Sequence, residues 1–218
     1  ESGYGEAQSP EEADVILVNT CAVRDHAEQR VLGRVGQLQQ YRETRPGVII
    51  GVTGCMAQRM GDDLLGRAGR VDLVMGPDGY RRLAEAISAL RQEAPVAKPA
   101  KATSVPLPVL SGGGSGGARG LTVLDFDPHE NYEGIVPRRT TAVSAWVPVQ
   151  RGCNYRCTYC IVPYVRGDEK NRAPSEILAE VRGLAESGIS EVTLLGQTVN
   201  SYEAQGWAFP QLLREVAR

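Results

Sequence analysis

The segment Gln150–Cys160 reads QRGCNYRCTYC and contains three of the five cysteines in the chain. Cys153, Cys157 and Cys160 follow C-x3-C-x2-C spacing, so their thiolates can reach one metal centre. A 4Fe–4S cluster has four irons, and cysteine thiolate is its usual protein ligand. Three ligands would leave one iron open to bind a small molecule. Structural zinc requires four ligands, commonly as two pairs, and no second pair follows, so the spacing favours an iron–sulfur centre.

The residues around this segment predict alternating strands and helices. A strand over 141–150 runs into the cysteine loop, and a helix over 174–188, a strand over 191–195 and the start of a helix over 210–218 follow. Strand, metal loop, helix and strand is the order expected at the start of a β/α barrel, in which active sites lie at the C-terminal ends of the strands. Cys153 and Gly196 both follow such a strand end.

The N-terminal part predicts a parallel sheet. Three short apolar runs, at 14–19, 48–52 and 71–75, are typical of strands that are buried on both faces. Amphipathic helical patterns lie between and after them: apolar residues from Ala27 to Leu38 at three- and four-residue spacing, then 62–68 and 80–91. Strands that alternate with helices indicate an α/β fold with a parallel sheet.

The cysteine segment and its continuation to Gly167 resemble the radical S-adenosylmethionine (SAM) enzymes and, more specifically, the tRNA methylthiotransferase family. Within that family they resemble the branch that makes 2-methylthio-N6-isopentenyladenosine. Three further motifs agree with it in order and spacing: NTCAVR at 19–24, GCMAQ at 54–58 and LLGQTVNSY at 194–202. The resemblance covers nearly the whole chain outside the stretch around 94–120.

The resemblance implies three domain-level segments. Residues 1–93 would form an N-terminal methylthiotransferase α/β domain, incomplete at its N-terminus. Residues 94–120, rich in Pro, Ala and Lys and then in Gly and Ser, have the composition of a flexible linker. Residues 121–218 would form the first part of a radical SAM β/α (TIM-like) barrel. The chain begins with Glu1 rather than Met and stops inside an expected helix, so we expect it to be a fragment of a longer protein.

The resemblance also implies the chemistry of the cysteine loop. Cys153, Cys157 and Cys160 would ligate a 4Fe–4S cluster whose open iron binds the methionine part of SAM. One electron would then split SAM into methionine and a 5′-deoxyadenosyl radical. No catalytic residue is implied beyond the cluster ligands.

Four other residues are implied to contact SAM. Tyr159 stands where the family has an aromatic residue near the SAM adenine, although a core tyrosine is an equal alternative. Gly196 and Gln197 match the place where the second barrel strand contacts the SAM amino group, and glycine permits close backbone approach. Asn200 would line the same site or stabilise the turn.

Cys21 and Cys55 form a second pair of candidate ligands. Each follows an expected strand, and parallel strands placed side by side bring such loops to one edge of a sheet. Two separated cysteines are by themselves more often buried core residues. The family motifs around both imply instead that they ligate an auxiliary 4Fe–4S cluster. A further ligand of that cluster lies in a family segment that would precede Glu1, so the auxiliary cluster lacks a ligand in this chain.

Composition excludes several classes of protein. The net charge is −2, which argues against a compact RNA-binding module, and 42% hydrophobic residues fit a globular protein. An odd number of cysteines argues against a secreted disulfide framework. No apolar run is long enough for a transmembrane helix. We therefore expect a cytoplasmic protein without a membrane partner.

The function implied is the addition of a methylthio group to carbon 2 of N6-isopentenyladenosine at position 37 of tRNA. Expected partners are tRNA, a flavodoxin- or ferredoxin-like electron donor, and a sulfur donor. The alternatives are methylthiolation of threonylcarbamoyl-adenosine tRNA or of a ribosomal protein aspartate, and a non-catalytic metal-binding module. His26 and His129 are expected to be solvated. Five basic residues near the cysteine loop would contact RNA phosphates or form a solvated charge run: Arg138, Arg139, Arg166, Lys170 and Arg172.

Overall fold

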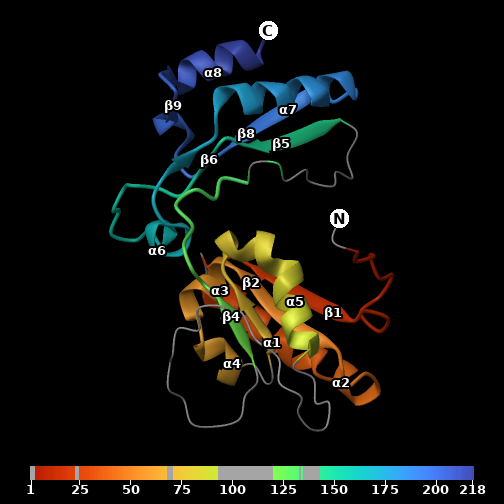
Figure 1. Ribbon diagram of the computed structural model, residues 1–218. Helices are drawn as coiled ribbons and strands as arrows, with labels where there is room; N and C mark the ends of the chain where they lie inside the picture. Colours follow the sequence, from red (N-terminus) through yellow and green to blue (C-terminus); the bar gives the residue numbers. More distant parts are fainter. Residues whose placement is uncertain (1–2, 23–24, 68–70, 93–119, 133, 135–142) are drawn as a thin grey trace, which may run out of the picture. The chain divides into compact units, whose positions relative to one another are not determined.

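The computed structural model describes residues 3–22, 25–67, 71–92, 120–132, 134 and 143–218 (Figure 1). The chain divides into two compact units, Glu1–Leu124 (unit 1) and Asp125–Arg218 (unit 2). None of the helices in these described ranges is long and apolar enough to cross a membrane. Each unit is built as a mixture of helices and strands.

Unit 1 is organised around one parallel sheet, with strand order β1-β2-β3-β4. The elements in chain order are β1 (Val15–Thr20), α1 (Asp25–Leu38), α2 (Tyr41–Thr44), β2 (Ile49–Gly54), α3 (Cys55–Met60), α4 (Asp63–Arg67), β3 (Leu73–Met75), the 3-10 helix η1 (Pro77–Arg82), α5 (Leu83–Gln92) and β4 (Leu121–Val123). The expected α/β class with a parallel sheet is therefore confirmed for this unit.

The sheet of unit 1 is covered on both faces. Ile50, Val52 and Val74 pack in one buried cluster with residues of α1 and α3. Leu73 and Met75, which alternate with Val74 along β3, pack in a second cluster with α5 (Figure 1). Successive side chains of a strand point to opposite faces, so β2 and β3 are buried throughout, as expected from their apolar runs.

The first strand differs from its expected burial. β1 pairs with β2 at one edge of the sheet, and Leu17 on it is 37% exposed. The expectation that residues 14–19 form a strand buried on both faces is therefore wrong. An apolar run identifies a strand, but the position of that strand in the sheet decides how much of it is covered.

The fourth strand bears on where the first unit ends. The second domain is expected to begin at residue 121, whereas β4 pairs in parallel with β3, with Leu121 opposite Leu73. The two compact units divide after Leu124. The expected linker, residues 94–120, lies outside the described residues except for Gly120.

Unit 2 contains one parallel strand pair joined through a helix. Its elements are β5 (Ser144–Pro148), β6 (Gln150–Arg151), α6 (Val162–Arg166), β7 (Lys170–Asn171), α7 (Pro174–Glu186), β8 (Glu191–Leu195), the 3-10 helix η2 (Val199–Ser201), β9 (Glu203–Ala204), β10 (Trp207–Ala208) and α8 (Phe209–Val216). β5 and β8 are parallel neighbours, and β6 pairs antiparallel with β7. Val147, Ile177, Leu184 and Leu212 lie in the buried core between the strands and helices α7 and α8.

Candidate metal centre

The cysteine loop of unit 2 is closed at its base. β6 enters the loop and β7 leaves it, and Gln150 pairs there with Asn171. The N–H of Cys153 donates to the carbonyl of Gly167 at 3.2 Å. Gly152 has a φ of +74°, and a Cβ on it would lie 2.0 Å from the carbonyl oxygen of Asp168. Only glycine fits this position, and the close contact at Gly152 fixes the backbone position from which the Cys153 side chain extends.

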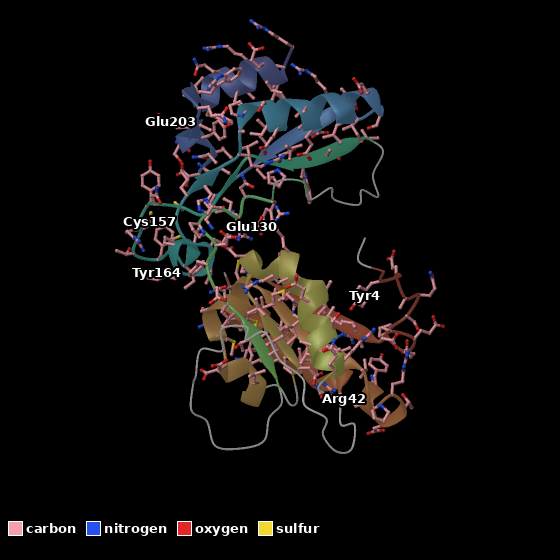
Figure 2. The ribbon with its side chains drawn as sticks, viewed as in Figure 1. Tyr4, Arg42, Glu130, Cys157, Tyr164 and Glu203 are labelled. Carbon is pink, nitrogen blue, oxygen red and sulfur yellow. The ribbon has the colours of Figure 1, made fainter. Side chains whose placement is uncertain are left out.

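The three cysteines of the loop are free thiols in different surroundings. Cys153 is buried, Cys157 is exposed and Cys160 is half-buried. The N–H of Cys160 donates to the carbonyl of Cys157 at 3.0 Å, so these two residues share a turn. Figure 2 shows Cys157 and Tyr164 on the side of unit 2 where the loop and α6 lie.

The three thiols are on one loop, but their sulfur atoms do not converge on a common point as they would around a metal. Within the residues that the structure describes, no three His, Cys, Asp or Glu side chains are grouped closely enough to hold a metal ion. Residues 154–159, which include Cys157, are all exposed, whereas Cys160 at the end of this stretch is half-buried.

Hydrogen bonds join the start of this loop to the turn that follows β8. The amide oxygen of Gln197 accepts from the N–H of Gly152 at 2.8 Å. The amide oxygen of Gln150 accepts from the N–H of Thr198 at 2.9 Å. Thr198 Oγ1 lies 3.3 Å from Cys153 Sγ. Residues about 45 positions apart in the sequence therefore meet at the C-terminal ends of neighbouring strand segments.

The residues expected to contact SAM have distinct positions. The side chain of Tyr159 is 91% exposed, so the core alternative for this residue is wrong. Asn200 is exposed on η2. A Cβ on Gly196 would lie 2.9 Å from Cγ1 of Val199 and 3.0 Å from both Cβ and Oε1 of Gln150, so this glycine permits the close approach of both side chains. The SAM contacts of these residues remain predictions.

Cys21 and Cys55 are placed at one edge of the sheet of unit 1. Thr20 and Gly54, which directly precede them, are paired across β1 and β2. Cys55 is buried at the start of α3, and Cys21 is exposed. Gly54 has a φ of +96°, and a Cβ on it would lie 2.4 Å from the carbonyl oxygen of Thr20. The expected meeting of the two loops follows from this strand pairing.

Comparison with known proteins matches both units. Residues 1–76 match the model of the uncharacterized protein family UPF0004, and residues 147–217 match that of the radical SAM superfamily. A tRNA-2-methylthio-N(6)-dimethylallyladenosine synthase of Parabacteroides distasonis is 40% identical over 222 residues, which cover 99% of this chain and 43% of that protein. The synthase of the same name from Burkholderia lata is 38% identical over 200 residues, which cover 92% of this chain and 38% of that protein.

The chain therefore carries a UPF0004 match followed by a radical SAM match, and it is similar to the synthases of this name over nearly all of its own length. It spans less than half the length of the curated relatives that it matches. The radical SAM superfamily implies a 4Fe–4S cluster, and the donor set of the cysteine loop fits one: three free thiols on one short loop that is closed at its base. In unit 1, Cys21 and Cys55 provide two thiols at one sheet edge.

The basic residues near the cysteine loop separate into different groups. Arg172 is buried, and its guanidinium pairs with Glu180 at 2.9 Å and donates to the carbonyl of Pro148. It is therefore a structural cation, neither an RNA contact nor part of a solvated charge run. Lys170 donates to the carbonyl of Asp127. Arg138 and Arg139 lie outside the described residues, and His26 and His129 are exposed, as expected.

Sequence reasoning missed Gln150 and Thr198. Both stand inside the motifs that carry the family resemblance, and Gln150 is 3% exposed although its side chain is polar. The sequence signal that could have identified Gln150 is its place, as a polar residue, at the end of an apolar strand and directly before the cysteine loop.

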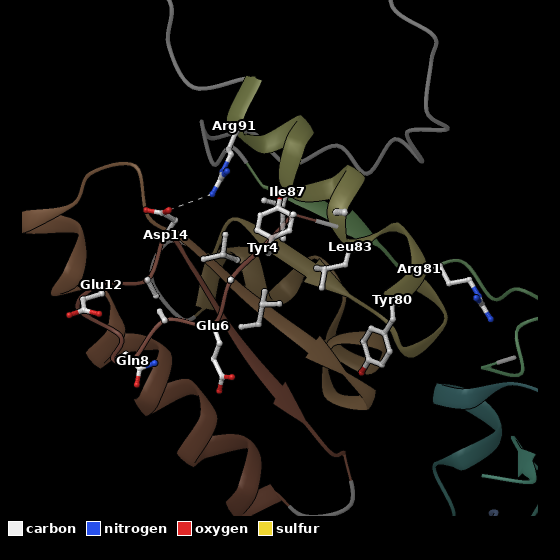
Figure 3. Close-up of a pocket in the computed structure, with 17 residues that line it drawn as sticks. Tyr4, Glu6, Gln8, Glu12, Asp14, Tyr80, Arg81, Leu83, Ile87 and Arg91 are labelled. Atoms are coloured by element: carbon white, nitrogen blue, oxygen red, sulfur yellow. Dashed lines mark ion pairs between the residues drawn. The ribbon is translucent and has the colours of Figure 1, made fainter. Parts of the chain in front are cut away.

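A cavity of about 880 Å³ lies in unit 1, and none of the five cysteines lines it (Figure 3). Its walls are the segment Gly3–Gln8, the edge strand β1 and the helix α5. Tyr4 and Arg91 both line it, with the guanidinium 5.5 Å from the ring centre.

Proposed function

We propose that the chain carries the cluster-binding part of a methylthiotransferase that modifies carbon 2 of N6-isopentenyladenosine at position 37 of tRNA. The names of the relatives support this substrate over threonylcarbamoyl-adenosine and over a ribosomal protein aspartate. The observation that carries the proposal is the meeting of the cysteine loop with the turn after β8, where Thr198 lies beside Cys153.

The residues of unit 2 would hold and orient the reacting groups. Cys153, Cys157 and Cys160 would hold a 4Fe–4S cluster, with one iron left for SAM. The bound cluster and SAM supply the radical chemistry, while the protein supplies orientation and exclusion of water. Gly152 sets the start of the loop, and Gln197 holds the backbone of Gly152.

The remaining expected residues complete this proposal. Tyr159, Gly196, Gln197 and Asn200 would lie next to SAM. Cys21 and Cys55 would contribute to an auxiliary cluster that holds the sulfur to be transferred. The parallel pair β5 and β8, joined through α7, would be the start of a β/α barrel, and the cysteine loop would then stand at the end where such barrels have their active sites.

The partners in the proposal follow from the chemistry. tRNA is the substrate, a flavodoxin- or ferredoxin-like protein supplies electrons, and a separate donor supplies sulfur. In this proposal the protein works in the cytoplasm.

The test is the metal content of the purified chain after anaerobic reconstitution with iron and sulfide. We expect iron and sulfide in a ratio fitting 4Fe–4S, and an electron paramagnetic resonance signal of the reduced sample that changes on adding SAM. Cys157→Ala should lose this signal, whereas Thr158→Ala, an exposed neighbour on the same loop, should retain it. Zinc without iron would contradict the proposal and leave a non-catalytic metal-binding module.

A further inference from the structure

We propose that Thr198 is a positioning residue that orients the sulfur of Cys153 toward the cluster, and that Gln150 holds Thr198 in place. This inference rests on the proposed function, because it assigns a role to a contact of one cluster ligand. It concerns two residues to which the family resemblance gave no role.

The contact itself is between two side chains of limited freedom. Thr198 Oγ1 lies 3.3 Å from Cys153 Sγ, within hydrogen-bond range for sulfur. Cys153 is 6% exposed, so its thiol has few other directions in which to point. A threonine has a branched Cβ with restricted rotation, so the position of its backbone largely decides where the hydroxyl lies.

Gln150 fixes that backbone position. Its Oε1 accepts from the N–H of Thr198 at 2.9 Å, and its Nε2 donates to Ser201 Oγ at 3.0 Å. Both ends of the buried amide are therefore used on the same turn. The close approach of Gln150 depends on Gly196, because a Cβ there would lie 3.0 Å from the glutamine side chain.

A second amide ties the same two segments in the opposite direction. Gln197 Oε1 accepts from the N–H of Gly152 at 2.8 Å. Gln150 thus reaches from β6 to the turn after β8, and Gln197 reaches from that turn back to the residue before Cys153. These two hydrogen bonds, one from each glutamine amide, hold the backbone around Cys153 in place. Cys157 and Cys160 lie in the more exposed part of the loop.

A hydroxyl that donates to a cluster ligand has a measurable effect on the cluster. Hydrogen bonds to the ligand sulfurs help set the reduction potential of an iron–sulfur cluster. Reduction adds negative charge, which a donor to sulfur stabilises, so loss of the donor makes the midpoint potential more negative. Thr198→Val removes the hydroxyl at nearly constant shape, and Thr198→Ser keeps it.

The experiment uses the whole 218-residue chain, reconstituted anaerobically, and compares the wild type with Thr198→Val, Thr198→Ser and Gln150→Leu. The readouts are iron content, the g-values of the reduced cluster and its midpoint potential. We expect a shift to more negative potential in Thr198→Val and Gln150→Leu and near wild-type values in Thr198→Ser. Loss of the cluster in Thr198→Val with retention in Thr198→Ser, both folded by circular dichroism, supports the same role.

Two results overturn the inference in distinguishable ways. If iron binding depends on Cys153, as tested by Cys153→Ala, but Thr198→Val has the wild-type potential and g-values, the inference fails and the proposed function stands. If the wild type takes up no iron, or Cys153→Ala takes up as much as the wild type, the proposed function fails and the inference fails with it.

Discussion

Two glycines prepare both groups of candidate ligands in the same way. Gly152 precedes Cys153 and Gly54 precedes Cys55, both with positive φ. In each case the place of a Cβ is taken by a backbone oxygen of a neighbouring segment, Asp168 or Thr20. Each cysteine therefore follows a residue at which two backbone segments are in contact. This contact fixes the backbone of the cysteine and limits where its sulfur can lie.

Gly152→Ala should destabilise unit 2 and lower its iron content. A side chain there adds the strain of a left-handed conformation, about 1–2 kcal/mol, to that of overpacking, about 1–3 kcal/mol. The matched control is Gly188→Ala, where φ is +89° but nothing lies within 4 Å of the added Cβ. Urea unfolding should show the smaller loss for the control. Equal losses in the two variants would show that the contact with Asp168 contributes nothing.

Tyr202→Phe should change how stability depends on pH. Burial raises the pKa of Tyr202 to about 12 from 10.0, and its hydroxyl donates to the carbonyl of Arg172 at 2.7 Å. The neutral phenol is favoured in the folded state, so its contribution is fully present below pH 10 and is lost as pH rises from 10 to 12.

The measurement is the free energy of unfolding at several pH values from 8 to 12. At pH 8, Tyr202→Phe should be less stable by about 1 kcal/mol because the hydrogen bond is lost. Above pH 10 the difference between variant and wild type should shrink. A difference in the free energy of unfolding that stays constant from pH 8 to 12 would show that the pKa of Tyr202 is not raised in the folded state.

At the scale of elements, the sequence predicted the central strands and the short helix α4, expected over 62–68, but it missed other short helices. β2, β3 and β8 lie where apolar runs were found. α3 was missed because Cys55–Met60 follows β2 without a break. Its N-cap residue is Gly54, which has no side chain that could cap the helix and so signal its start. α6 was missed because Val162–Arg166 is too short to show a helical period.

The candidate site was predictable in part for a related physical reason. Cys153 and Gly196 both follow strand ends, and the parallel pairing of β5 with β8 brings together the segments that follow these strands. The hydrogen bonds of Gln150 and Thr198 were not predictable, because they depend on the relative register of two turns. The pairing of Arg172 was also not predictable, since Arg172 lies before α7 and Glu180 lies eight residues further on, within that helix.

The contact between α2 and the start of β3 gives an element-scale prediction. Asp72 Oδ2 accepts from Arg42 and also from the N–H of Ile50 at 2.9 Å. The two side chains of the ion pair are 15% and 7% exposed. Asp72→Ala should therefore lower the free energy of unfolding by about 3 kcal/mol, since it leaves a buried cation without this partner.

The control for Asp72→Ala is Asp14→Ala. Asp14 pairs with Arg45 at the surface, where its side chain is 66% exposed, and such pairs contribute about 0–1 kcal/mol. Guanidinium chloride unfolding of both variants separates the effects. A loss after Asp72→Ala no larger than after Asp14→Ala would refute the assignment of Asp72 as a structural anchor.

At the scale of the whole molecule, the buried clusters stay within their own units. Ile50 belongs to a core of unit 1, and Ile177 to the core of unit 2. Ile177→Ala should destabilise unit 2 by about 3 kcal/mol, the usual loss for truncating a buried aliphatic side chain. Amide hydrogen exchange should accelerate in β5, α7 and β8 and stay unchanged in β2.

Ile50→Ala is the reciprocal control for this prediction. It should accelerate exchange in β2 and β3 and leave α7 unchanged. If either substitution accelerates exchange equally in both units, the two cores unfold as one cooperative structure.

The unequal exposure of the loop thiols has a consequence for handling the protein in air. Cys157 and Cys160 stand in a C-x-x-C arrangement and share a turn, while Cys153 is buried. Exposed thiols oxidise first, and a thiol close in sequence can resolve the oxidised one as a disulfide. We expect aerobic preparations to close a Cys157–Cys160 disulfide that locks two ligands away from iron. Such a disulfide must be reduced before iron and sulfide are added. The order in which reductant and iron are added therefore decides what fraction of the protein binds a cluster.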